Sequence, residues 1–108
     1  MKHYVMMLKL TGQGIQNLDQ IGDLMRAVTE DWGLLGGKAE AYAVMGEYDF
    51  IVHGTAKNDE DITWFAAQVA HSGLLTPQTM RAFTDAEMDA IFEDPPAEPL
   101  RIIRTLRE

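Results

Sequence analysis

The sequence has no cysteine, few basic residues and no long apolar run. The absence of cysteine excludes disulfides, iron–sulfur clusters, thiolate zinc sites and cysteine nucleophiles. Nine Lys and Arg residues against seventeen Asp and Glu residues give a formal net charge of −8 with histidine neutral. A chain of that charge repels polyanions, so we expect it to bind neither nucleic acid nor an anionic membrane surface.

Several signatures of catalysis and targeting are also missing. No apolar stretch is long enough to cross a membrane, and the first residues lack the pattern of a signal peptide, so we expect a cytoplasmic protein. The single Gly-x-Gly at residues 12–14 lacks the third glycine of a dinucleotide-binding loop. The three histidines, His3, His53 and His71, have none of the short spacings of metal ligands. We therefore predict no metal site and no cofactor.

The pattern of apolar residues predicts a single domain. The chain has 108 residues, of which 46% are hydrophobic, enough for one core. Alternating apolar positions predict four strands, at residues 3–11, 38–45, 48–55 and 74–83. Apolar positions three and four apart predict helices around residues 18–32, 62–70 and 84–92. Pro77 indicates that the first part of the last strand is irregular or lies at a sheet edge.

The order of these elements, β-α-β-β-α-β followed by a short helix, fits an α+β ferredoxin-like sandwich. In this fold a four-stranded antiparallel sheet carries two helices on one face. Gly46 and Glu47 provide the turn between the second and third strands. We expect the domain to span residues 1–93. Residues 94–108 are expected to form a proline-containing linker and a basic, apolar tail.

The strands are apolar on both faces, although two helices cover only one face of such a sheet. The first strand sets Tyr4 and Met6 on one face and Val5 and Met7 on the other. A second copy related by a two-fold axis is the simplest cover. We therefore expect a homodimer, or a higher oligomer, in which facing sheets form a dimeric α+β barrel around a pocket for a small apolar or aromatic ligand. In the alternative, the second face is mildly apolar and stays in water.

The third strand carries the candidate catalytic residues. Its alternation sets Asp49, Ile51 and His53 on one face, where Tyr42 joins them if the hairpin register allows. His53 and Asp49 are then candidates for general acid–base catalysis. In the competing interpretation, Asp49 caps the hairpin turn through its carboxylate and His53 is a half-buried strand residue.

The hairpin also carries a resemblance to a known family. The segment Gly46-Glu47-Tyr48-Asp49, preceded by residues 36–38 and Tyr42, resembles the GYD domain family. Further matching blocks lie at residues 4–5, 11–14, 26, 73, 79, 81–83 and 87–88. The resemblance covers about residues 1–93 and implies a small bacterial or archaeal protein built like a dimeric α+β barrel, with no settled reaction. On this resemblance Tyr48 and Asp49 are signature positions and Gly46 is the turn glycine.

The sequence supports three functional hypotheses. The first is a homodimeric small-molecule-binding or accessory module whose pocket is lined by Tyr42, Tyr48, Ile51 and Met7. The second is a cofactor-free dimeric-barrel enzyme, of oxygenase or isomerase type, with proton transfer by His53 and Asp49. The third is a structural or regulatory subunit that docks a partner through its tail.

Overall fold

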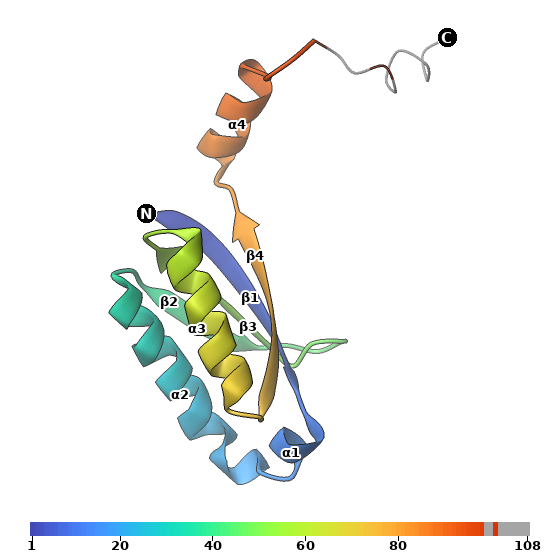
Figure 1. The fold of residues 1–108 in the computed structure, drawn as a ribbon. Coiled ribbons are helices and arrows are strands. Elements are labelled where there is room, and N and C mark those ends of the chain that lie inside the picture. The colour runs from blue at the N-terminus through green and yellow to red at the C-terminus, as the bar shows by residue number, and fades with distance from the viewer. Residues whose placement is uncertain (99–100, 102–108) are drawn as a thin grey trace.

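The computed structural model describes residues 1–98 and 101, and in this range it has one four-stranded sheet and four α-helices (Figure 1). The elements are β1 (Lys2–Leu10), α1 (Gly12–Ile15), α2 (Ile21–Trp32), β2 (Ala39–Ala43), β3 (Phe50–Ala56), α3 (Asp59–His71), β4 (Leu75–Ala82) and α4 (Asp85–Glu93). The strand order is β2-β3-β1-β4, and all neighbouring strands are antiparallel. The two long helices, α2 and α3, lie on one face of the sheet (Figure 1). The predicted α+β ferredoxin-like fold is confirmed.

The core lies between this face of the sheet and the two long helices. Its buried side chains are Tyr4, Met6, Leu8, Ile21, Met25, Val28, Trp32, Val52, Ala56, Ile62, Phe65, Val69 and Leu75. Trp32 is fully buried, and its indole Nε1 donates a hydrogen bond to the Thr55 carbonyl at 3.0 Å. The Trp32 ring also meets the Phe65 ring edge-on, with 5.7 Å between centroids. Because Trp32 ends α2 and Phe65 belongs to α3, these contacts join both helices to the sheet.

Capping side chains fix where α3 and α4 begin. The Asn58 side chain accepts a hydrogen bond from the Asp61 amide at 2.8 Å, and three acidic residues follow in the first turn of α3. At α4 the first turn is fixed by a capping box. The Thr84 hydroxyl accepts from the Glu87 amide at 3.2 Å, and the Glu87 carboxylate accepts from the Thr84 amide at 2.9 Å.

Two local predictions were wrong or incomplete, and a third is confirmed in one of its two forms. The helix expected around residues 18–32 begins instead with a 3₁₀ turn at Leu18–Gln20, and α1 comes before it, capped by the Thr11 hydroxyl. The prediction at Pro77 is confirmed in the second of its two forms, because β4 is an edge strand. Pro77 pairs with Leu8 and needs no ladder donor on its outer side, so the strand stays regular there. The β2–β3 connection spans residues 44–49 rather than a two-residue turn, and the Val44 amide closes it by donating to the Asp49 carbonyl at 2.9 Å.

Tyr4 links the sheet to the start of α3. Its ring is buried, and its hydroxyl donates to Asp59 Oδ1 at 2.5 Å. The Arg81 guanidinium lies 5.6 Å from the centroid of the same ring. Burial, reinforced by the hydrogen bond to Asp59, raises the pKa of Tyr4 from 10.0 to about 12.

The raised pKa of Tyr4 predicts a specific alkaline instability. A group that binds its proton more tightly in the folded chain stabilises folding below its unfolded pKa and loses that contribution as pH rises through the folded pKa. The free energy of unfolding should therefore fall between pH 10 and pH 12, and the fall should be shallower in Tyr4→Phe than in the wild type. Urea denaturation followed by circular dichroism at stepped pH measures this; identical slopes in the two proteins would contradict the assignment.

Candidate functional site

The candidate site is the face of the sheet opposite α2 and α3, which we call the open face. The side chains of the open face are identified by alternation along the strands: the residues next to them in sequence point into the core, so they point to the opposite side. Its members are His3, Val5, Met7, Lys9, Glu40, Tyr42, Ile51, His53, Thr55, Thr76, Gln78, Met80 and Ala82. Val5, Met7 and Ile51 are half-buried, while Met80 and Tyr42 are 38% and 50% exposed. The open face is therefore apolar at its centre.

The predicted ligand-binding residues lie in one row across the open face. Tyr42 pairs with Ile51, and Ile51 pairs with Met7 in the next strand. Met7 in turn pairs with Gln78, whose side-chain oxygen accepts a hydrogen bond from the Tyr48 hydroxyl. Tyr48 lies in the loop before β3, outside the regular strand, and this hydrogen bond brings its phenol to the row. The structure thus places Tyr42, Ile51, Met7 and Tyr48 together.

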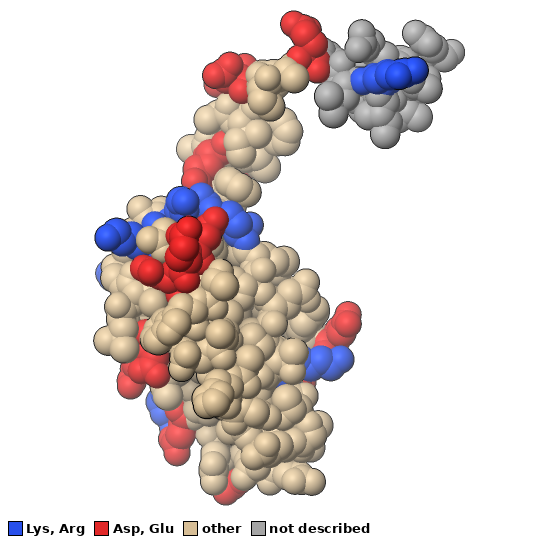
Figure 2. Space-filling model, in the orientation of Figure 1, with Lys and Arg blue, Asp and Glu red and all other residues tan. Residues whose placement is uncertain are grey.

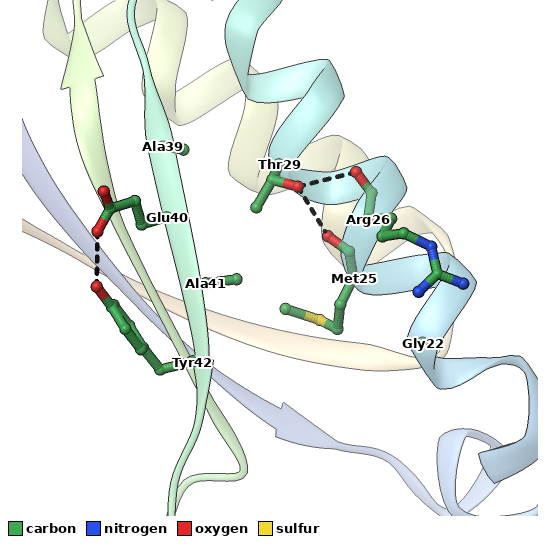
Figure 3. Close-up of a pocket in the computed structure, with 8 residues that line it drawn as sticks. All are labelled: Gly22, Met25, Arg26, Thr29, Ala39, Glu40, Ala41 and Tyr42. Atoms are coloured by element: carbon green, nitrogen blue, oxygen red, sulfur yellow. Dashed lines mark hydrogen bonds between the residues drawn. The ribbon is translucent and has the colours of Figure 1, made fainter.

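A polar cluster of Glu40, Tyr42 and His53 lies beside this row. The Tyr42 hydroxyl donates to Glu40 Oε2 at 2.6 Å (Figure 3), and His53 Nε2 lies 3.5 Å from the same oxygen. The Tyr42 and His53 rings stack, with 6.0 Å between centroids and 9° between planes. The hydrogen bond to Glu40, and then the negative charge of that carboxylate, raise the pKa of the Tyr42 phenol.

This arrangement gives the cluster a defined chemical capacity. A single carboxylate oxygen of Glu40 faces both a phenol and an imidazole, so a proton can pass between these groups without large movements. The side chains of His53 and Glu40 are 53% and 67% exposed, and a bound molecule can reach them directly. The same groups can also act only as hydrogen-bonding partners that orient a ligand.

Glu40 was not among the residues selected from the sequence, although a signal for it was present. It belongs to the same alternating set as Tyr42, and a turn centred on residues 46–47 sets it opposite His53. The observed pairing has this register, with Glu40 opposite His53 and Ala43 opposite Phe50. The pairing register of the whole hairpin identifies Glu40, whereas alternation along β3 alone does not.

Asp49 lies at the start of β3 with its carboxylate engaged elsewhere. Its Oδ2 accepts a hydrogen bond from the Leu10 amide at 2.8 Å, and its own amide donates to the Leu8 carbonyl at 2.9 Å. Within residues 1–98 and 101, no hydrogen bond or ion pair joins the Asp49 side chain to His53. The carboxylate that accompanies His53 is that of Glu40, and Asp49 caps the end of β1 rather than the hairpin turn.

Gly46 occupies the tip of the β2–β3 loop with a φ of 128°. This is a backbone conformation that residues with a side chain rarely adopt. A Cβ added at Gly46 would meet no atom within 4 Å, so the requirement for glycine comes from the backbone and not from crowding. The predicted role of Gly46 as a turn residue agrees with this geometry.

A groove of about 590 Å³ runs between α2 and the edge strand β2 (Figure 3). Met25, Arg26 and Thr29 line it from the helix, and Ala39 and Ala41 line it from the strand. Glu40 and Tyr42 also border the groove, since β2 is an edge strand with neither side chain covered. The polar cluster is therefore accessible from the edge of the sheet as well as from the open face.

The described residues contain neither a metal cluster nor a membrane-spanning helix. In the part of the chain that the structure describes, no three His, Asp or Glu side chains gather as a metal site. No helix among these residues is both long and apolar enough to span a membrane.

Removal of the Asp49 carboxylate tests its structural role. Asp49→Ala leaves the Leu10 amide without its partner, which should lower the free energy of unfolding by about 1–3 kcal/mol. The matched control is Glu47→Ala, an exposed acidic residue of the same loop, which should change it by less than about 0.5 kcal/mol. Urea denaturation measures both variants, and equal effects would contradict the capping role.

Removal of Glu40 tests the polar cluster. In Glu40→Ala both causes of the raised Tyr42 pKa disappear, so that pKa should fall towards its ordinary value of 10.0. NMR of the tyrosine ring carbons during a pH titration resolves Tyr42 from the other tyrosines. The control Glu30→Ala removes an exposed acid of α2 and should leave the titration of Tyr42 as in the wild type; a Tyr42 pKa unchanged in Glu40→Ala would refute the contact.

Comparison with known proteins agrees with the resemblance found at the hairpin. Neither the curated proteins nor the solved structures gave a match. A family model described as the GYD domain matches residues 4–92, which is most of the 108-residue chain. The matched segment contains the whole polar cluster and all of the sheet except Lys2 and His3 at the start of β1. The chain belongs to the GYD domain family.

Proposed function

We propose that this GYD domain protein is a homodimeric module that binds a small, partly aromatic molecule in a chamber between two open faces. The observation that carries the proposal is the composition of the open face, where an apolar row lies next to an ordered polar cluster. Apolar surfaces with a few convergent polar groups are the usual form of small-molecule sites.

The free energy of burial favours a cover for this face. Burying one exposed Val, Ile or Met side chain contributes roughly 1.5–3 kcal/mol. Val5, Met7, Ile51 and Met80 are partly exposed, so each gains about half of that at most. Summed over two copies, this gain is of the order of the about 4–15 kcal/mol that association costs. A second copy can therefore provide the cover.

The distribution of charge favours the same face as the contact surface. The whole chain has a net charge of −8, so most ways of bringing two copies together are repulsive. On the open face, Lys9 and Glu40 balance one another, and the remaining titratable side chains are His3, His53 and the phenol of Tyr42. Two copies meet there without the repulsion that their other surfaces impose.

The polar groups of the open face define the class of ligand. A flat ring can stack on the Tyr42 and His53 rings, and a hydroxyl on that ring can donate to Glu40. Met7 provides an adaptable apolar contact beside them. A small hydroxylated aromatic molecule satisfies these groups together.

A second candidate function is catalysis of proton transfer without a cofactor. The favouring observation is that Glu40 contacts both His53 and Tyr42, which gives the imidazole a carboxylate partner. In this version His53 is the base, and Glu40 takes the place that the sequence analysis gave to Asp49. The third hypothesis, a partner docked through the C-terminal tail, concerns residues of which 99–100 and 102–108 lie outside the described structure.

Sedimentation velocity tests the dimer. The wild type should sediment as a dimer at micromolar concentration, and Ile51→Glu should sediment as a monomer, because it places a charge at the centre of the open face. The matched control, Ala67→Glu, adds the same charge on the exposed side of α3 and should remain dimeric. A monomeric wild type, or equal behaviour of the two variants, would overturn the chamber.

Titration with naphthol tests the ligand class. Naphthol should shift the methyl resonances of Met7 and Ile51 and leave the fully exposed Met45 unchanged. Glu40→Ala should weaken this binding by about tenfold, since one hydrogen bond to a charged group contributes about 1.5–3 kcal/mol. Shifts confined to other parts of the molecule, or equal affinity in Glu40→Ala, would contradict the proposal.

A further inference from the structure

The helix α4 extends away from the body of the molecule. Figure 1 shows it beyond the end of β4, pointing away from the sheet and from α2 and α3. Among residues 1–98 and 101, no strand or other helix shares an extensive interface with it. A helix of nine residues is marginal in water without packing, because the cost of nucleation is spread over few hydrogen bonds. α4 therefore requires a surface to pack against.

One side of α4 is apolar and exposed. Met88, Ile91 and Phe92 are spaced as neighbours on one helix face, and they are 44%, 44% and 76% exposed. Ala86 and Ala90 lie on the opposite side of the helix. We call the exposed side formed by Met88, Ile91 and Phe92 the arm face.

The connection to β4 prevents the arm face from covering the open face of its own copy. Only Phe83 and Thr84 separate β4 from α4, and the capping box fixes the first turn of the helix. Arg81 then holds this turn to the sheet, because its guanidinium lies 3.4 Å from the Glu87 carboxylate and donates to the His3 carbonyl at 3.2 Å. Folding α4 back would break these bonds, so the arm face is directed towards another molecule.

We propose that α4 is an exchanged arm, whose Met88, Ile91 and Phe92 pack on the open face of a second copy and close one end of the ligand chamber. This inference rests on the proposed dimer. It gives the chamber a wall that the copy supplying Glu40, Tyr42 and His53 cannot provide for itself. Each site is then complete only when both copies are present.

The acidic charge of α4 favours the open face of a second copy as the surface on which it packs, because that face is close to neutral. Figure 2 shows acidic side chains along the visible side of α4. Residues 85–94 contain Asp85, Glu87, Asp89, Glu93 and Asp94 and no Lys or Arg. The rest of the chain is mostly acidic as well, but the open face has Lys9, His3 and His53 against the single acid Glu40. It is therefore an apolar surface on which an acidic helix meets little repulsion.

Because the chain has no cysteine, single cysteines introduced in two separate pools report contacts between copies. One full-length pool carries Phe92→Cys on the arm face. The other carries one cysteine on the open face, at Met80 or at Thr76, which samples both ends of β4. The pools are mixed, allowed to exchange subunits and treated with a short bis-maleimide. The control pool carries Ala90→Cys, on the opposite side of the same helix.

Each arm variant is paired with the cysteine at Met80 and with the cysteine at Thr76. With at least one of these two open-face positions, Phe92→Cys should give about fivefold more cross-linked heterodimer than Ala90→Cys. Phe92→Asp should also weaken dimerisation about tenfold in sedimentation equilibrium, while Ala90→Asp should not. Equal cross-linking from both sides of α4 in a protein that remains dimeric would overturn the exchanged arm and leave the chamber standing. A wild type that sediments as a monomer would overturn both.

Discussion

A sheet of four strands has two faces, and the long helices of this protein cover one of them. Alternation along each strand then determines which side chains lie on the uncovered face, because every residue between two core residues points away from the core. In β1 the positions next to Tyr4, Met6 and Leu8 hold Val5 and Met7, which would suit a core equally well. The surface left by this constraint carries the candidate site, and its exposed apolar centre is the common basis of the proposed chamber, dimer and arm.

The polar groups of the open face depend on the hairpin that presents them. Asp49 ties the start of β3 to the end of β1 through the Leu10 amide, and its carbonyl accepts a hydrogen bond from the Val44 amide just after β2. The register between β2 and β3 sets Glu40 opposite His53. Asp49 therefore acts on the cluster by holding the strands in place, while Glu40 supplies the carboxylate that Tyr42 and His53 share. Since β2 is an edge strand, the cluster lies where the open face and the groove beside α2 meet.

Periodicity was enough to predict the fold and the apolar second face, because strands and helices impose fixed repeats. It also set Ile51 and His53 on one face of the third strand, while the place of Tyr42 beside them depended on the register of the hairpin. It did not reveal α1, which depends on the hydrogen bond that the Gly14 amide donates to the Thr11 hydroxyl rather than on an apolar repeat. Nor does a repeat along α4 show which way the helix points; that direction depends on a two-residue connection and on Arg81. Identifying Glu40 as the partner of His53 requires the pairing register between β2 and β3. Alternation along a single strand does not give that register.

The methionines of this chain provide the most direct measurement of whether the open face is covered. Met6 is fully buried and Met45 is fully exposed, so their methyl groups calibrate the effect of a soluble paramagnetic agent on NMR relaxation. Met7 and Met80 lie on the open face, where Met80 is 38% exposed in a single copy. If a second copy covers the open face, both methyl groups should be protected to nearly the level of Met6 at high protein concentration. Relaxation of Met80 that stays close to that of Met45 at every concentration would contradict this cover.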